Sequence, residues 1–112
     1  MIIIQNYING KFESIDSTID DVNPATGEVI AQIPKSGSLE VENAVVAADL
    51  AKKSWSDLGL EKRTIWLDKI ADALESKSEE IASLESLDTG KPISLARVVD
   101  ASRSVANFRF FA

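Results

Sequence analysis

Acidic side chains are the residues of this chain whose type and spacing could do chemistry, and they gather in one segment. The sequence holds no cysteine and no histidine, which excludes a thiolate or imidazole metal site and a Cys or His nucleophile within these residues. Paired carboxylates could serve as general acid and base. With Lys77 as the only basic member among them, the set is instead typical of an exposed acidic helix face; it comprises the acids at 72, 75, 79, 80, 85 and 88.

Asp88 departs from this pattern because of where it falls in its helix. It lies in the last predicted turn before Gly90, where the helix dipole is negative and a carboxylate is disfavoured. A positive charge is expected to compensate. Two alternatives supply it: an ion pair with Lys91, or a bound cation held by hard oxygen ligands.

Charge and glycine spacing exclude other classes of function. The net charge of −6 argues against a surface that follows nucleic-acid phosphates, which requires clustered cations. The arginines at 97, 103 and 109 recur every six residues, so on a helix they spiral and form no stripe. They are predicted to be solvated or to face a partner. The five glycines are too dispersed for a phosphate-binding loop.

The apolar segments predict a soluble, cytoplasmic protein that binds no membrane. Residues 1–4, Met-Ile-Ile-Ile, are too few for the apolar region of a signal peptide and carry no basic flank. No apolar run approaches the ~20 residues that a helix needs to cross a bilayer. The absence of cysteine is compatible with a cytoplasmic setting.

The first third of the chain predicts two β-hairpins within residues 6–33. Asn9-Gly10 between two short alternating segments is a strong hairpin signal, because a type I′ turn needs positive φ at both central residues. In the second hairpin Pro24 presets φ for the turn and Gly27 completes it. Pro34 is expected to end the last strand.

The remainder predicts three helices, which makes the fold class α/β. Ser38 is the expected N-cap of the first helix, and Gly59 lies just past its end. The second begins near Glu61, is weakly interrupted at residues 76–78, and stops at residues 89–92, Thr-Gly-Lys-Pro. The third starts near Ile93 or Ser94. Trp55 and Trp66 fall on apolar helix faces, where core packing is the favoured interpretation.

Both ends of this arrangement predict that further structure is needed. Phe108, Phe110 and Phe111 place three aromatics within four residues, with no cap and no polar tail. A helix that stops there leaves apolar surface bare. Two isolated hairpins likewise need further strands or helix cover. The chain is therefore expected to be incomplete.

Several motifs in order resemble the N-terminal part of the NAD(P)-dependent aldehyde dehydrogenase superfamily. They cover essentially the whole chain: Tyr-Ile-Asn-Gly-Lys-Phe at 7–12, Val-Asn-Pro-Ala-Thr-Gly-Glu-Val-Ile at 22–30, Val-Glu-Asn-Ala-Val-Val-Ala-Ala at 41–48 with Trp55, Leu-Asp-Thr-Gly-Lys-Pro at 87–92, and Phe-Phe-Ala at 110–112. Each motif alone is weak. The specificity comes from their order and spacing.

The resemblance implies that residues 1–112 are part of a Rossmann-type cofactor-binding domain. The catalytic cysteine, glutamate and asparagine of the family, and its NAD-binding lysine and glycine loop, come from later positions that this sequence does not contain. The segment alone is therefore expected to be inactive. The complete form would oxidise an aldehyde to a carboxylic acid with NAD or NADP, as a homo-oligomer. Residues 103–112 resemble the branch that acts on muconic semialdehydes.

The resemblance also implies a monovalent cation site, for potassium or sodium. Some family members bind such an ion with backbone carbonyls just before the Asn-Pro turn and with the aspartate of the Leu-Asp-Thr-Gly motif. By position these residues are Asp21, Val22 and Asp88. The cation alternative for Asp88 is thereby strengthened. Neither catalytic nor cofactor-binding residues are predicted within the segment.

Two further interpretations stay open beside the dehydrogenase. In one, the chain is a catalytically inactive truncated paralogue or interaction module that docks its aromatic end, Phe108 to Phe111, on a larger subunit. In the other, it is an acidic helical adaptor with a small β element. Independent cooperative folding favours the adaptor, whereas a molten isolated chain favours truncation.

Overall fold

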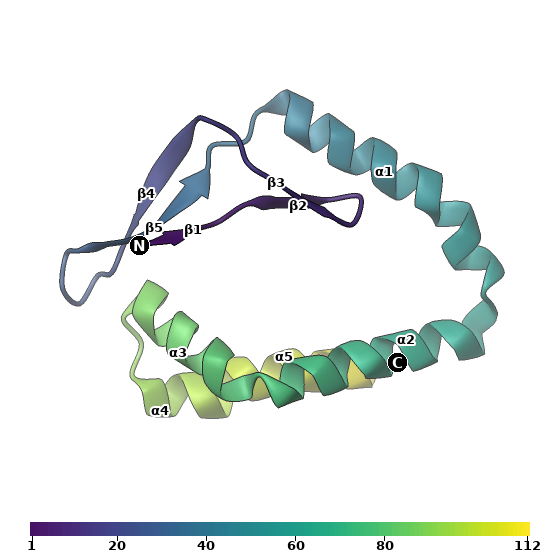
Figure 1. Cartoon of the computed structure of the whole chain (residues 1–112). Helices are drawn as coiled ribbons and strands as arrows, with labels where there is room; N and C mark the ends of the chain where they lie inside the picture. The colour runs from purple at the N-terminus through teal and green to yellow at the C-terminus, as the bar shows by residue number, and fades with distance from the viewer. The chain divides into compact units, whose positions relative to one another are not determined.

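The computed structural model describes all residues, 1–112, and the chain folds as two compact units, Met1–Asp57 and Leu58–Ala112. Each unit is described by itself. The first contains five strands and a helix: β1 (Ile2–Ile3), β2 (Asn6–Ile8), β3 (Lys11–Glu13), β4 (Thr18–Val22), β5 (Val29–Pro34) and α1 (Ser38–Asp57) (Figure 1). The second is helical: α2 (Gly59–Ser76), α3 (Ser78–Thr89), α4 (Ile93–Leu95), a π-helical segment η1 (Ala96–Ala101) and α5 (Ser102–Phe111). The predicted α/β class is confirmed.

The first predicted hairpin is formed by β2 and β3. Tyr7 pairs with Phe12 in an antiparallel register, and their rings pack with centroids 4.9 Å apart. Asn9 and Gly10 adopt φ values of 52° and 76°. Positive φ at both central residues is what a type I′ turn requires. The turn predicted from Asn9-Gly10 is confirmed.

The second predicted hairpin, β4 with β5, belongs to a three-stranded sheet in the order β1-β5-β4. Pro34 pairs with Thr18 as the last residue of β5, so the strand ends where expected. The third strand was not predicted. Ile2 and Ile3 pair in parallel with Ala31 and Gln32 of β5, and an edge strand of two residues carries too little alternation to be recognised in the sequence.

Helix α1 begins one residue earlier than predicted. Ser38 is its first helical residue, so Ser38 is not the N-cap. The preceding residue, Gly37, donates its amide hydrogen to Oε2 of Glu40 at 2.6 Å, which is the reciprocal half of a capping box. The carboxylate three residues into the helix therefore satisfies the open amide. The helix ends at Asp57, just before Gly59 as predicted; Gly59 has φ 77° and is the first residue of α2.

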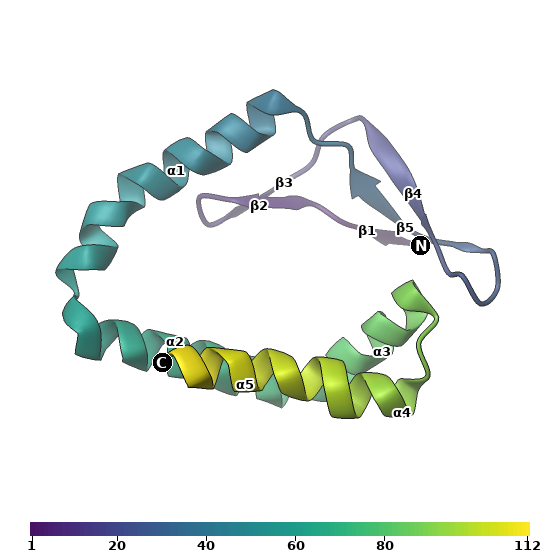
Figure 2. The ribbon, with the colours of Figure 1, turned by 180° about the vertical axis from the view of Figure 1, so that it is seen from behind.

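In the second unit α2 and α5 lie side by side in both views (Figures 1 and 2). The Thr64 hydroxyl donates to the carbonyl of Ala112 at 2.8 Å. Arg109 Nη2 contacts Asp72 Oδ1 at 2.9 Å and Glu75 Oε2 at 2.7 Å. These two carboxylates, Asp72 first, raise the pKa of Arg109. The acidic face of α2 is therefore paired by an arginine of α5.

The three arginines predicted to be solvated or to face a partner are all exposed, and two of them also form ion pairs within the chain. Arg109 binds α2, and Arg97 Nε contacts both carboxylate oxygens of Glu79 at 3.0 Å. Arg103 forms none of the ion pairs in the structure. Six-residue spacing alone did not reveal that acidic side chains on other helices face these arginines.

The second predicted helix divides into α2 and α3, and the third contains an unpredicted π segment. Lys77 separates α2 from α3 with φ −111° and ψ 15°, within the weak interruption predicted at 76–78. Helix α2 starts at Gly59, two residues before the predicted Glu61. The third helix starts at Ile93, as predicted, but runs through η1 before α5. A single π turn produces no repeating hydrophobic pattern, so the sequence alone does not indicate it.

Most of the buried residues of the chain are alanines. Ala71, Ala82, Ala96 and Ala101 are at most 1% exposed, and no large side chain is fully buried. Trp55 and Trp66 are 42% and 49% exposed, so the core position predicted for them is wrong for this chain. No helix combines the length and apolar content that a membrane crossing needs.

Gly27 provides a test of the second hairpin. Its φ is 75°, and an added Cβ would meet no heavy atom within 4 Å, so Gly27→Ala should destabilise by backbone strain alone, about 1–2 kcal/mol. Gly27→Asn is the matched control, because asparagine tolerates the left-handed conformation, and it should cost less. Thermal unfolding followed by circular dichroism measures both. Equal stability of Gly27→Ala and the parent would contradict this turn geometry.

Candidate functional site

The first part of the predicted cation site lies at a β-bulge. Asp21 pairs with Ala31 but Val22 pairs with Val29, so the register shifts between them and β5 carries one extra residue. A bulge locally disrupts the ladder and leaves the extra residue unpaired. Asp21 is half-buried and Val22 exposed. The predicted main-chain ligands therefore lie where the hydrogen bonding of the sheet is irregular.

The turn that follows the bulge is fixed by hydrogen bonds around Asn23. The side-chain oxygen of Asn23 accepts from the amide of Ala25 at 2.8 Å, and its carbonyl accepts from the amide of Gly27 at 2.8 Å. Its own amide donates to the Glu28 carbonyl at 2.9 Å. Three of the four polar groups of Asn23 are thus engaged, which fixes the turn that follows the bulge.

The third predicted ligand, Asp88, is an exposed side chain in the last turn of α3. It takes part in none of the ion pairs. The helix stops as predicted at Gly90, which has φ 72° and donates its amide hydrogen to the Ser86 carbonyl at 3.0 Å. Asp21 and Val22 belong to the first unit and Asp88 to the second, and the cation site stays a prediction.

A metal site made of clustered side chains is absent from the chain. No group of three acidic residues lies together in a way that could hold a metal ion. A cation bound in this segment would thus rest largely on main-chain oxygens. Such ligands carry no side-chain signature, which is why Asp21 and Val22 were assigned from the resemblance to the family.

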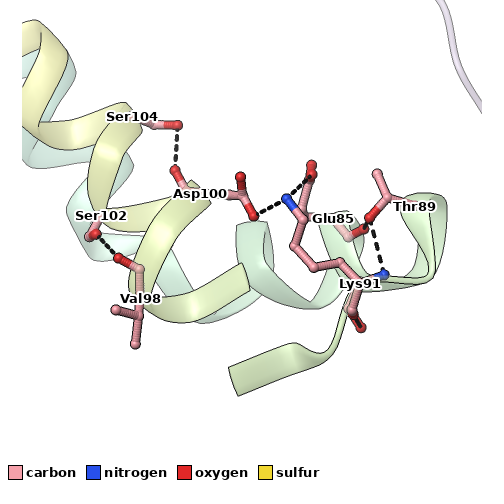
Figure 3. Close-up of polar contacts among 8 residues, drawn as sticks. Glu85, Thr89, Lys91, Val98, Asp100, Ser102 and Ser104 are labelled. Atoms are coloured by element: carbon pink, nitrogen blue, oxygen red, sulfur yellow. Dashed lines mark hydrogen bonds and ion pairs between the residues drawn. The ribbon is translucent and has the colours of Figure 1, made fainter. Parts of the chain in front are cut away.

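Lys91 does not pair with Asp88, so the simple ion pair predicted for these two residues is wrong. Its ammonium contacts Asp100 Oδ2 at 2.5 Å and Glu85 Oε1 at 3.3 Å (Figure 3). Glu85 lies one turn before Asp88 on α3, and Asp100 lies in η1. The lysine turns back from the helix stop towards η1 and leaves Asp88 without a partner.

The Lys91 cluster is partly shielded from water, and its charges support one another. The side chains of Lys91, Glu85 and Asp100 are 28%, 32% and 28% exposed. The hydrogen bond to Asp100 raises the pKa of Lys91 and is the main cause of the shift; that to Glu85 adds to it, and burial partly opposes both. An ammonium held by two carboxylates keeps its proton, so this lysine has no lone pair for nucleophilic chemistry.

The loop that carries Lys91 is fixed by its neighbours as well. The Ser86 hydroxyl donates to the Lys91 carbonyl at 2.6 Å, and the Lys91 amide donates to Thr89 Oγ1 at 3.3 Å. The Thr89 hydroxyl in turn donates to the Glu85 carbonyl at 2.7 Å. The Leu-Asp-Thr-Gly-Lys-Pro motif thus builds a rigid helix stop. Asp100, its partner nine residues further on, had no sequence signal.

A broad apolar groove runs along α1 in the first unit. Val45, Ala48 and Trp55 form much of it, and the helix contains no buried residue. Two polar residues, Asp49 and Lys52, border it and form an exposed ion pair with each other at 3.4 Å. A face of this composition can pack against protein but offers no acid, base or nucleophile.

The strand pairs, the Asn23 turn and the Leu-Asp-Thr-Gly-Lys-Pro stop are the structural elements that the sequence motifs build. The sequence profile described as the aldehyde dehydrogenase family matches residues 12–112. This chain belongs to the aldehyde dehydrogenase family, and the predicted resemblance is confirmed.

Its relatives share sequence along the whole chain. It is 46% identical over 112 residues to the 2-aminomuconic semialdehyde dehydrogenase of Mus musculus, covering 100% of this chain and 23% of that protein. It is 43% identical to the 2-hydroxymuconic semialdehyde dehydrogenase of Pseudomonas sp. (strain CF600), covering 97% of this chain and 23% of that protein. The chain thus spans about a quarter of the length of these relatives.

Solved structures of the family have the same fold. PnpE in complex with nicotinamide adenine dinucleotide superposes with a TM-score of 0.92 at 43% identity, over 96% of this chain and 22% of that one. Lactaldehyde dehydrogenase from Escherichia coli superposes with a TM-score of 0.93 at 32% identity, over 97% of this chain and 23% of that one. The predicted N-terminal aldehyde dehydrogenase fold is therefore confirmed.

The Lys91 cluster yields a pH-dependent prediction. Because the folded state raises the pKa of Lys91, the stabilisation is fully present below its ordinary value of 10.5 and is lost as pH rises through the raised value. Asp100→Asn should therefore destabilise the chain at neutral pH, and its deficit relative to the parent should shrink above pH 10.5. Urea unfolding across this pH range measures the difference.

Asp88→Asn, measured in buffer without potassium or sodium, is the matched control, since it removes the same charge from a carboxylate that has no ion pair. It should be neutral or slightly stabilising, because a carboxylate at a helix C-terminus opposes the dipole. Equal destabilisation by Asp88→Asn and Asp100→Asn would show that Lys91 responds to overall charge and not to its contact with Asp100.

Proposed function

We propose that this chain is the N-terminal portion of an enzyme that oxidises an aldehyde to a carboxylic acid with NAD or NADP, and that its substrates are muconic semialdehydes. The main support for this proposal is the match to the aldehyde dehydrogenase family over residues 12–112. The substrate class is supported by relatives named 2-aminomuconic and 2-hydroxymuconic semialdehyde dehydrogenase, at 43–47% identity. NAD is supported by the complex of PnpE.

On this proposal residues 1–112 are a partial cofactor-binding domain. The sequence offers no cysteine. Two neighbouring carboxylates of α2, Asp72 and Glu75, are both held in ion pairs by Arg109. The groups that attack the aldehyde and hold the cofactor would follow further along a longer polypeptide. The exposed apolar residues of α1 and α5 agree with this, since they would pack against those later segments.

A second candidate is an interaction module that docks on a larger dehydrogenase subunit. Phe110 and Phe111 favour it, because they are 82% and 74% exposed and pack edge to face with centroids 5.0 Å apart. A bare aromatic pair of this kind is typical of a surface that contacts protein. The two candidates differ in whether the covering protein is the same polypeptide.

The proposed setting of the complete form is a cytoplasmic homo-oligomer with no role in nucleic-acid or membrane binding. The acidic balance of the chain supports the exclusion of nucleic acid. We also propose a monovalent cation, potassium or sodium, held by the carbonyls of Asp21 and Val22 and by Asp88. Its support is the β-bulge at Asp21 and Val22 and the unpaired carboxylate of Asp88 at a negative helix end.

The function is tested by the intact mass and the activity of the gene product isolated from its native cells. We expect a mass far above 12.2 kDa and NADH formation with 2-hydroxymuconic semialdehyde, at a higher kcat/KM than with a short aliphatic aldehyde. The isolated chain 1–112 should produce no NADH under the same conditions. A native product of 12.2 kDa that co-purifies with a larger dehydrogenase would instead support the docking module.

The cation is tested by thermal unfolding of the native gene product in potassium, sodium and choline chloride at equal ionic strength. At about ten times the Kd, one bound ion adds roughly 1.4 kcal/mol of stability. Asp88→Ala should abolish the difference between potassium and choline. Val22→Ala should preserve it, because its ligand would be a main-chain carbonyl. Retention of the full potassium effect in Asp88→Ala would exclude Asp88 as a ligand.

A further inference from the structure

The π-helical segment η1 is explained by two alanines that pack on the same neighbour. Ala96 and Ala101 are 0% and 1% exposed, and both cluster with the buried Ala82 of α3. In an α-helix residues five apart point about 140° away from each other. In a π turn, which bonds residue i to residue i+5, they return to the same side. Shared burial of Ala96 and Ala101 therefore favours the π form.

The outer side of η1 is tied to its surroundings by two ion pairs. Near one end, Arg97 Nε contacts both carboxylate oxygens of Glu79 at 3.0 Å. Near the other, Asp100 contacts the Lys91 ammonium at 2.5 Å. Glu79 belongs to the first turn of α3 and Lys91 to the loop after it, so the segment is held at two separated points.

Serine hydroxyls complete the hydrogen bonding after the π turn (Figure 3). The Ser102 amide donates to the Val99 carbonyl, and its hydroxyl donates to the Val98 carbonyl. In an α-helix the Val98 carbonyl would accept the Ser102 amide itself. The Ser104 hydroxyl donates to the Asp100 carbonyl at 2.9 Å. The side chains thus satisfy carbonyls at the point where the backbone leaves the α pattern.

We propose that η1 is a register latch. The helix between Ile93 and Phe111 contains one residue more than regular α-helical packing would need, and the π turn accommodates it. The contact of Lys91 with Asp100 holds the segment in the π form. Release of Asp100 lets the segment take α-helical hydrogen bonds. The turn that carries Arg97 then rotates by about 100° relative to α5, which is the angle of one residue. The rotation breaks the contact between Arg97 and Glu79. This conformational role is separate from the proposed function and rests on the second unit alone.

The extra residue is expected on the outer side of η1. Val98 and Val99 are 73% and 37% exposed, and both lie between the two buried alanines. Deletion of Val99 would place Ala96 and Ala101 four residues apart, a spacing that an α-helix keeps on one face. The helix before and after the deletion would then retain its contacts without any π turn.

Two single-residue deletions in the full chain test this geometry. Deletion of Val99 should preserve the helical circular dichroism and the thermal transition. Deletion of Ala106, an exposed residue in regular α5, should lower the transition temperature, because it turns both Phe108, which lines an apolar hollow with Leu67, and Arg109 away from α2 by about 100°. Equal loss for both deletions would overturn the proposal. Tolerance of both would overturn it as well, since helix register would then not matter.

Amide hydrogen exchange tests the latch without deleting a residue. Asp100→Asn and Lys91→Met should each accelerate exchange across residues 96–102 by roughly tenfold, as expected for losing a hydrogen bond between charged groups. Glu61→Gln, which removes an exposed carboxylate of α2 with no ion pair, should leave this exchange unchanged. Unchanged protection of residues 96–102 in both Asp100→Asn and Lys91→Met would show that the alanine packing alone fixes the π form, and would overturn the latch.

Discussion

Close approach of backbones through alanine is the contact on which the helical unit depends. Ala82 of α3 meets Ala96 and Ala101 of η1, and all three are essentially fully buried. Alanine removes little apolar area from water, about one methyl group each, so this contact contributes modest hydrophobic free energy. It fixes instead how near the helices lie and which turns face each other. The π form of η1 agrees with this contact, because it places Ala96 and Ala101 on the same side.

Because the buried side chains are small, polar ties hold much of the arrangement. Arg109 joins α5 to two carboxylates of α2, and Lys91 joins the end of α3 to η1. Exposed ion pairs contribute little individually, whereas those of Lys91 are partly shielded. The large apolar side chains are mostly exposed. Contacts within the chain therefore bury little of its apolar surface and gain little hydrophobic free energy from it. A longer polypeptide of the family would supply the missing cover.

The sequence was informative where structure is local. Asn9-Gly10 predicted its turn because few residues adopt positive φ, and Gly90 with Pro92 predicted the end of α3. It failed where structure depends on residues far apart. The partner of Lys91 was predicted as Asp88 because of proximity along the chain, and Asp100 was chosen by the fold. The two tryptophans were assigned to a core because helical spacing shows which face is apolar, without showing what covers it.

The distribution of charge also explains the role of Lys91 in the Leu-Asp-Thr-Gly-Lys-Pro motif. A catalytic carboxylate or lysine needs a shifted pKa and access to substrate. Here the pKa of Lys91 is raised by its partners, which fixes its charge and withdraws it from proton transfer. The Leu-Asp-Thr-Gly-Lys-Pro motif therefore acts as a helix stop that binds η1 through its lysine. Asp88, the carboxylate of that motif, is exposed and has no partner in the ion pairs of the fold.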